Sequence, residues 1–219
     1  MVLGVVGRVG SGKSSFARAL GRMGAEVANA DEMVHRLLRE PAVKQAVVNA
    51  FGVDVLGMTG QVERTAVADI VFGDERKLRQ LNRLLHPVVR EAVCRKARAP
   101  SDAALVIDAP LLFEGGLADL CDRIVFVDAP EDVCRRRLRR TRGWDPDEAD
   151  RRQRFQRDAQ WKMARSDAVI DNTGSERDLI EKARRFWRDA TCARNRDNRT
   201  LPPVAATKQE ADRQNGRRA

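Results

Sequence analysis

Residues that build metal centres and disulfide frameworks are few in this sequence. Only four of its 219 residues are cysteine, and only two are histidine. The cysteines show no C-x-x-C spacing and neither histidine lies near them in the sequence, which argues against a zinc site. Four thiols without a disulfide pattern are typical of a reducing compartment. We therefore expect the protein to be cytoplasmic.

Long hydrophobic runs are missing as well. No apolar run approaches the roughly 20 residues that a membrane-spanning helix needs. The N-terminus leads directly into the apolar residues 2–6, which leaves no room for the basic segment and the core of a signal peptide. The sequence therefore predicts a soluble protein with no membrane partner.

Aromatic residues make up only 5% of the chain, whereas basic residues are abundant. The net charge is +9, and residues 130–219 hold 24 Lys and Arg against 16 Asp and Glu. Ten arginines between Arg135 and Arg157 could form a nucleic-acid patch, a solvated helix face or a group that closes over phosphates. The aromatic residues among or close to these arginines are Trp144, Phe155 and Trp161. Three are too few to stack single-stranded bases, so we expect no nucleic-acid partner.

The most informative pattern is a phosphate-binding motif near the N-terminus. Residues 7–14 read Gly-Arg-Val-Gly-Ser-Gly-Lys-Ser and match G-x-x-x-x-G-K-[ST]. An apolar run precedes the motif, and apolar residues follow it at helical spacing from Phe16 to Met23. This order of strand, glycine-rich turn and helix directs backbone N–H groups toward phosphate oxygens at a helix N-terminus.

Each residue type in the motif has a chemical reason. Gly10 and Gly12 have no Cβ atom to block a phosphate group. Lys13 can reach β- and γ-phosphates, and the Ser14 hydroxyl can bind Mg²⁺. The motif alone does not separate kinases from GTPases, ATPases or helicases.

Four further segments read as buried strands, at residues 26–30, 104–107, 123–127 and 168–170. Their apolar runs are continuous and helical patterns lie between them, which predicts an α/β fold with a parallel sheet. All four are followed at once by an aspartate: Asp31, Asp108, Asp128 and Asp171. Ligands of such sheets bind at the carboxyl ends of the strands, so these carboxylates are expected near the phosphate loop. Each could instead cap a helix, and Asp128 fits that role best because Pro130 follows it.

The remaining chain reads mostly as helix. Residues 32–100 contain no comparable strand and read as helices at 32–39, 42–51, 64–72 and 75–98. We interpret 32–100 as a helical insertion between the second and third strands, and the stretch at about 134–165 also reads as helical and is very basic. Residues 188–219 contain few apolar residues, which predicts a disordered basic tail.

Three features favour a small-molecule kinase. The chain is short, Asp31 is placed to accept the proton of an attacking hydroxyl, and the insertion is large enough to enclose an acceptor. The guanine-reading pattern Asn-Lys-x-Asp of GTPases is missing. Two alternatives stay open: a nucleoside monophosphate kinase, although residues 32–72 hold few basic residues for an acceptor phosphate, and a nucleic-acid-binding regulator.

Several further stretches resemble the dephospho-CoA kinase family. Residues 106–114, Val-Ile-Asp-Ala-Pro-Leu-Leu-Phe-Glu, resemble its D-x-P-L-L-F-E stretch, and residues 81–87 resemble its L-x-x-x-L-H-P stretch. Residues 169–174 are similar to V-I-D-N-x-G, and residues 51–64 to F-G…D-G-x-x-D-R. The phosphate loop and Asp31 fall in order with these, so that the resemblance covers about residues 2–187.

The resemblance implies a three-layer P-loop kinase fold and transfer of phosphate from ATP to the 3′-hydroxyl of dephospho-CoA, the last step of CoA synthesis. It implies a kinase core formed by 1–31 and 101–187, a helical acceptor-binding insertion at about 32–100 and a helical lid at about 134–165. It implies that Asp31 acts as base and that Lys13, Arg140 and Arg142 assist the transfer, the two arginines competing for one role in the lid. The implied ATP-binding residues are Gly10, Ser11, Gly12, Lys13, Ser14, Ser15, Asn172 and Gly174. The implied acceptor-binding residues are Asp31, Arg64, His86 and Asp108, and the implied Mg²⁺ ligands are Ser14 and Asp108.

The chain also departs from the family pattern. Arg8 stands where members usually carry Gly, and Asn29 stands where Asp is common. Two of the implied acceptor residues have structural alternatives: His86 could orient a helix end, and Arg64 could pair at the surface with Glu63 or Asp69. The sequence leaves the oligomeric state open.

Overall fold

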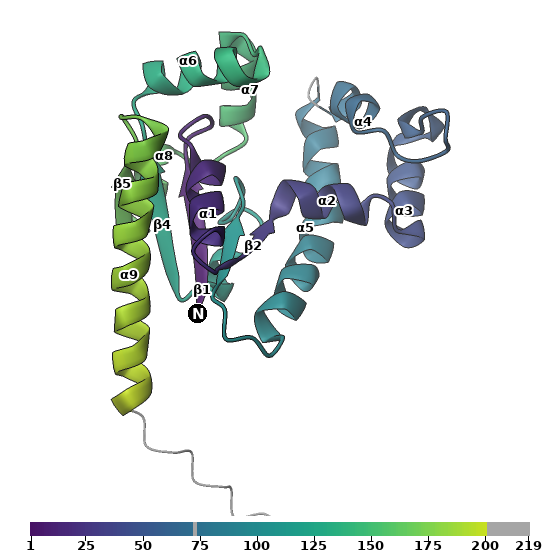
Figure 1. The fold of residues 1–219 in the computed structure, drawn as a ribbon. Helices are drawn as coiled ribbons and strands as arrows, with labels where there is room; N and C mark the ends of the chain where they lie inside the picture. The colour runs from purple at the N-terminus through teal and green to yellow at the C-terminus, as the bar shows by residue number, and fades with distance from the viewer. Residues whose placement is uncertain (72–73, 201–219) are drawn as a thin grey trace, which may run out of the picture. The chain divides into compact units, whose positions relative to one another are not determined.

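A computed structural model describes residues 1–71 and 74–200, with side chains for 1–71 and 74–192. The core is one parallel sheet of five strands in the order β2-β3-β1-β4-β5 (Figure 1). The strands are β1 (Val2–Gly7), β2 (Glu26–Asn29), β3 (Leu105–Asp108), β4 (Arg123–Asp128) and β5 (Ala168–Asp171). The predicted α/β fold with a parallel sheet is confirmed.

The register of the sheet brings the ends of its strands together at one edge. Asn29 at the end of β2 lies beside Asp108 at the end of β3, and Asp108 also lies beside Val5 of β1. Asp128 and Asp171 are paired in the same way on the other side of β1. The chain leaves β1 at this edge to form the phosphate loop, so the loop and the acidic strand ends share one face of the sheet.

The remaining elements of the core are α1 (Lys13–Gly21), a 3₁₀ turn at Ala118–Leu120, α6 (Glu131–Arg142), α7 (Pro146–Arg154), α8 (Ala159–Met163) and α9 (Glu176–Thr200). Strand, loop and helix at the phosphate motif follow the predicted order. The chain divides into two compact units, Met1–Arg184 and Arg185–Ala219, and the first of these holds all five strands. None of the helices in the described ranges is both long and apolar enough to cross a membrane.

The insertion after β2 folds as four α-helices, as predicted. These are α2 (Ala30–Leu37), α3 (Pro41–Phe51), α4 (Arg64–Val71) and α5 (Glu75–Arg98), with a 3₁₀ turn at Val53–Val55. Phe72, at the predicted end of the third helix, lies outside the described residues. The insertion has its own apolar cluster, which includes Val47, Val55, Val71 and Leu81.

Helix α5 links the insertion to the sheet. Leu78, Leu81 and Leu85 belong to the apolar cluster of the insertion, whereas Val89 and Val93 pack into the main core with residues of β3 and β4. All five follow helical spacing on one face. His86 lies between the two groups along the helix, which places it where the insertion meets the core.

Three predictions about local structure are wrong. Asp128 does not cap the next helix: it ends β4, and α6 begins with Pro130 at its N-cap, without a side-chain cap. The second strand ends at Asn29 rather than at residue 30, because the Asn29 side chain caps α2. Residues 188–200 are not disordered but continue α9. Extending a formed helix costs far less than nucleating one, which explains the continuation. Residues 201–219 lie outside the described residues.

Candidate active site

The phosphate loop leaves its backbone amides open to an anion. Gly10 and Gly12 adopt left-handed φ angles of 81° and 96°, which favour glycine. Gly12 is the N-cap of α1, so no side chain caps the helix, and its first turn holds no acidic residue. The first amides of α1 therefore have no side-chain acceptor, and the helix dipole favours a phosphate group there.

Asn172 holds the loop in this shape. It is only 4% exposed, and its Nδ2 atom donates a hydrogen bond of 2.7 Å to the backbone oxygen of Ser11. A Cβ atom at Gly12 would lie 2.3 Å from this Nδ2 atom, so the position excludes any other residue. The side chain of Ser11 is fully buried, which leaves its backbone as the part that contributes to the site. Asn172 thus acts on the loop, a contact that the sequence motif does not reveal.

Lys13 lies at the base of the loop and is 7% exposed. Its Nζ atom donates hydrogen bonds to the backbone oxygens of Gly7 at 3.2 Å and Arg8 at 2.6 Å. Burial lowers the pKa of the ammonium group to about 8, although the carboxylate of Asp108 opposes this shift. The lysine is therefore a desolvated cation whose partners in the loop are neutral carbonyl groups.

Ser14 and Asp108 form a pair of oxygen donors beside Lys13. Asp108 is 3% exposed, and burial raises its pKa while a hydrogen bond from Ser14 and the charge of Lys13 oppose the rise. No helix follows Asp108 directly, so it does not serve as a cap. A hydroxyl and a carboxylate oxygen suit Mg²⁺, which also keeps several waters and phosphate oxygens in such sites. Within the described ranges, no group of three or more His, Cys, Asp and Glu could hold a metal ion.

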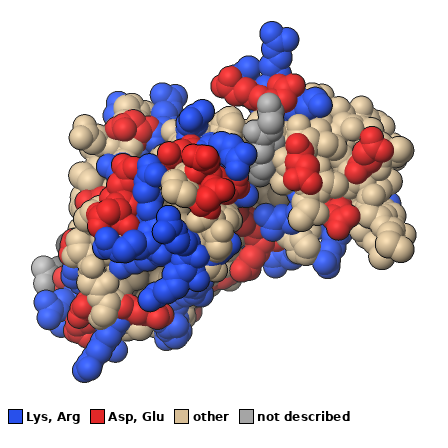
Figure 2. Space-filling model, turned by 90° about the horizontal axis from the view of Figure 1, so that it is seen from above, with Lys and Arg blue, Asp and Glu red and all other residues tan. Residues whose placement is uncertain are grey.

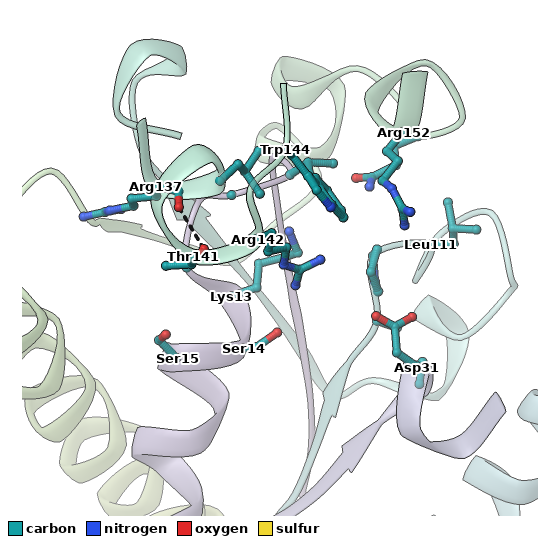
Figure 3. A pocket seen from close by; sticks show the side chains of 18 of the residues that line it. Lys13, Ser14, Ser15, Asp31, Leu111, Arg137, Thr141, Arg142, Trp144 and Arg152 are labelled. Atoms are coloured by element: carbon teal, nitrogen blue, oxygen red, sulfur yellow. Dashed lines mark hydrogen bonds between the residues drawn. The ribbon is translucent and has the colours of Figure 1, made fainter. Parts of the chain in front are cut away.

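Asn29 joins Asp108 to the start of α2, the helix whose first turn holds Asp31. Its Nδ2 atom donates a hydrogen bond of 2.9 Å to Asp108, and its Oδ1 atom accepts one of 3.0 Å from the backbone nitrogen of Glu32. The second bond caps α2 and leaves Asp31, in the first turn, free of a capping role. Asp31 lines the cavity opposite Ser14 (Figure 3). A strand-end Asn followed by two acidic residues is an N-cap signal that could have identified Asn29 from the sequence.

A cavity of about 1200 Å³ joins the phosphate loop, Ser14 and Asp31. Common ligand sites measure about 300–1,000 Å³, so this cavity can hold more than one small substrate. The phosphate loop and the start of α1 form one wall, while Asp31, His86 and the loop after β3 form the other. Burial lowers the pKa of His86, and Glu114 nearby opposes this.

The segment predicted to be a lid lines one side of this cavity. Arg140 and Arg142 both line it, and so does Trp144. The indole of Trp144 lies between two guanidinium groups, at 4.8 Å from Arg142 and 4.2 Å from Arg152 (Figure 3). The neighbouring Arg137 instead donates a hydrogen bond of 3.0 Å to the backbone oxygen of Gly174.

Acidic partners neutralise much of the basic segment. Arg135 pairs with Glu131 and Asp150, and Arg136 pairs with Asp132. Figure 2 shows adjoining Lys and Arg side chains on this side of the molecule, with Asp and Glu side chains beside them. The acidic partners therefore balance part of the positive charge of this segment.

One predicted site residue does not join the others. Arg64 begins α4 and is exposed, and it is not among the residues that line the cavity. Of the other acceptor candidates, Asp31 and His86 line the cavity, whereas Asp108 lies buried behind Ser14. Ser15, Asn172 and Gly174 also line it, on the side of the phosphate loop.

Comparison with known proteins agrees with this geometry. A family model described as dephospho-CoA kinase matches residues 1–178. The curated dephospho-CoA kinase of Corynebacterium diphtheriae is 41% identical over 192 residues, covering 85% of this chain and 95% of the relative. The crystal structure of TT1252 from Thermus thermophilus has a TM-score of 0.73 at 28% identity and covers 88% of this chain and 97% of its own. The solved dephospho-CoA kinase from Campylobacter jejuni, with a TM-score of 0.66 at 21% identity, shares the fold over 88% of this chain and 98% of its own.

Proposed function

The chain belongs to the dephospho-CoA kinase family, and on that premise we propose that it transfers the γ-phosphoryl group of ATP to the 3′-hydroxyl of the ribose of dephospho-CoA. The products are CoA and ADP, so the protein is a kinase of CoA biosynthesis. The observation that supports this most is the placement of Asp31 across one large cavity from the phosphate loop. A donor nucleotide on the loop and an acceptor hydroxyl at Asp31 would share that cavity.

The residues of the site divide the chemistry between them. Asp31 accepts the proton of the attacking hydroxyl, as a general base does. Lys13 exchanges the carbonyl groups of Gly7 and Arg8 for the β- and γ-phosphates and balances their charge. Ser14 and Asp108 would hold Mg²⁺, which neutralises charge on the phosphates when it is bound. Arg140 and Arg142 approach the transferring group from the lid.

A comparison of acceptors tests this function. ADP release is measured with ATP and Mg²⁺ on the full chain, with dephospho-CoA, AMP and adenosine as acceptors at equal concentrations. We expect turnover with dephospho-CoA well above that with either of the others. Preference for AMP would instead show a nucleoside monophosphate kinase, and equal ADP release without any acceptor would show an ATPase.

The lowered pKa of Lys13 predicts that ATP binding takes up a proton above pH 8. In the free protein the ammonium group begins to lose its proton near its pKa of about 8. Bound phosphates favour the charged form and raise that pKa, so a proton enters with the ligand. ATP affinity should accordingly fall as pH rises through 8 to 9, by up to about tenfold per pH unit. Titration calorimetry in two buffers of different ionisation enthalpy measures the proton directly.

The control for this measurement is Lys13→Arg, which keeps its positive charge at every pH used. Proton uptake should disappear in that variant. In the wild-type protein, the number of protons taken up per bound ATP should grow from pH 8 to pH 9. If the wild-type protein takes up no proton over this range, Lys13 does not contact the phosphates.

The basic lid should respond to nucleotides rather than to nucleic acid. Trypsin should cut rapidly in the free protein after exposed arginines such as Arg142, Arg151 and Arg154, and ATP with dephospho-CoA should protect these positions by closing the lid. Duplex or single-stranded DNA should protect only weakly at physiological salt, where non-specific dissociation constants are about 10⁻⁴–10⁻⁶ M. Strong protection by DNA and none by the substrates would show that the basic segment binds nucleic acid rather than closing over the nucleotides.

A further inference from the structure

A buried lysine lies outside the catalytic residues described above. Lys162 in α8 is 1% exposed, although a lysine is almost never fully buried unless its charge is paired. Its Nζ atom donates hydrogen bonds to the backbone oxygen of Pro110 at 3.2 Å and to Oε1 of Gln156 at 2.9 Å. It also lies 3.9 Å from Oε1 of Glu114, which forms an ion pair with it.

Glu114 lies in the loop after β3 and is the last residue of the stretch that resembles the family motif D-x-P-L-L-F-E. It binds residues of the segment that contains Lys162. Its Oε1 atom accepts a hydrogen bond of 2.5 Å from the backbone nitrogen of Arg157, while its Oε2 atom is buried without a hydrogen-bond partner among the described residues. An aromatic contact joins the same two segments, because the rings of Phe113 and Trp161 meet edge to face with their centroids 5.1 Å apart. Loop 110–114 is therefore joined to residues 156–162 by a buried ion pair, hydrogen bonds and a ring contact.

The two segments joined in this way belong to different parts of the cavity wall. Pro110 and Leu111 line its acceptor side, and the loop approaches His86 so closely that a Cβ atom at Gly115 would lie 3.8 Å from the imidazole ring. Gln156 lines the cavity just after lid helix α7. The lid is attached to the core at two ends, at β4 before α6 and at residues 156–162 after α7. The second attachment is made to the acceptor loop.

We propose that Lys162 and Glu114 are positioning residues that anchor the C-terminal end of the lid to the acceptor loop. This inference rests on the proposed function, since it concerns how the lid arginines reach the reacting phosphate. A lid that turns about a fixed anchor brings Arg140 and Arg142 to the same place in each turnover. Because the anchor is the acceptor loop itself, a bound acceptor that orders the loop also orders the lid. Neither residue touches the substrates.

A double substitution separates positioning from stability. Lys162→Met alone leaves the Glu114 carboxylate buried and unpaired, which should lower Tm. Glu114→Leu combined with Lys162→Met replaces the pair by apolar groups, a change that is often neutral or stabilising. The double variant should therefore regain most of the lost Tm, yet it lacks every polar bond between the loop and residues 156–162. The matched control is Glu26→Leu with Lys96→Met, because that ion pair joins β2 to α5 at the other end of the sheet.

We expect the double variant to bind ATP alone with wild-type affinity while its kcat falls by about 10²-fold, because small misplacements of catalytic groups have effects of that size. Without substrates, trypsin should cut after Arg154 and Arg157 several-fold faster than in the wild-type protein, and dephospho-CoA alone should no longer slow these cuts. The control variant should match the wild-type protein in kcat and cutting rates.

Two results would overturn the anchor. One is a double variant whose kcat returns to the wild-type value together with its Tm, because the pair would then contribute only to stability. The other is an unchanged rate of cutting after Arg154 and Arg157 in the absence of substrates. The cutting rates need no turnover, so they test the anchor even if the acceptor assay of the wild-type protein rejects the proposed function.

Discussion

Replacing Lys13 with alanine should reduce kcat by about 10²–10³-fold in a protein that stays folded. The ammonium group is the only side-chain cation within the phosphate motif that is buried at the loop, and its present partners are two backbone oxygens. Those oxygens cannot replace a positive charge when negative charge develops on the transferring phosphoryl group. Initial rates of ADP release with saturating ATP and dephospho-CoA measure the loss.

The fold should tolerate this change, because removing a desolvated charge also removes the cost of burying it. Circular dichroism and Tm therefore accompany the rate measurements. Lys96→Met serves as the control, since Lys96 of α5 pairs with Glu26 at the start of β2, at the end of the sheet opposite the phosphate loop. Near-normal turnover in a folded Lys13→Ala protein would contradict the role given to the phosphate loop.

Replacing Asp31 with asparagine should lower kcat by about 10²–10⁴-fold and leave ATP affinity almost unchanged. Asparagine keeps the shape of the side chain but cannot accept the proton of the attacking hydroxyl. The cap of α2 is made by Asn29, so the substitution does not remove a helix cap. Rates at saturating substrates and calorimetric titration with ATP separate the two effects.

Glu32→Gln is the matched control for Asp31→Asn. Glu32 is the next residue in the same helical turn, is exposed and contributes its backbone nitrogen, not its side chain, to the cap. Its neutralisation should change kcat by less than about twofold, since surface charges have small effects. If both variants keep the wild-type kcat, the proton is accepted elsewhere or without a base.

Much of this architecture follows from the sequence because it depends on local patterns. Continuous apolar runs predicted the parallel strands, and the glycine spacing predicted the loop between β1 and α1. The boundary of β2 was harder to predict, because a side chain that ends a strand can also cap the next helix. Asn29 does so and, at the same time, binds Asp108 from 79 residues away.

The contacts that hold the site together are not local and could not be predicted. Asn172 meets the phosphate loop 161 residues away in the chain, through the order of β1, β4 and β5 in the sheet. Lys162 lies in a basic stretch of the sequence that gives no sign of burial, yet it is buried against Pro110 and Glu114. Arg64 illustrates the opposite case, because its motif predicted acceptor binding and the structure places it outside the cavity.

Identification of the phosphorylated hydroxyl tests the central claim most directly. The full chain is incubated with ATP, Mg²⁺ and dephospho-CoA, and the product is analysed by mass spectrometry and by ³¹P NMR against authentic CoA. We expect one added phosphate per acceptor, on the 3′-hydroxyl of the ribose, with one ADP formed for each CoA. Phosphate on another hydroxyl, or ADP formed without a phosphorylated acceptor, would contradict the assignment of Asp31 and the cavity to this reaction.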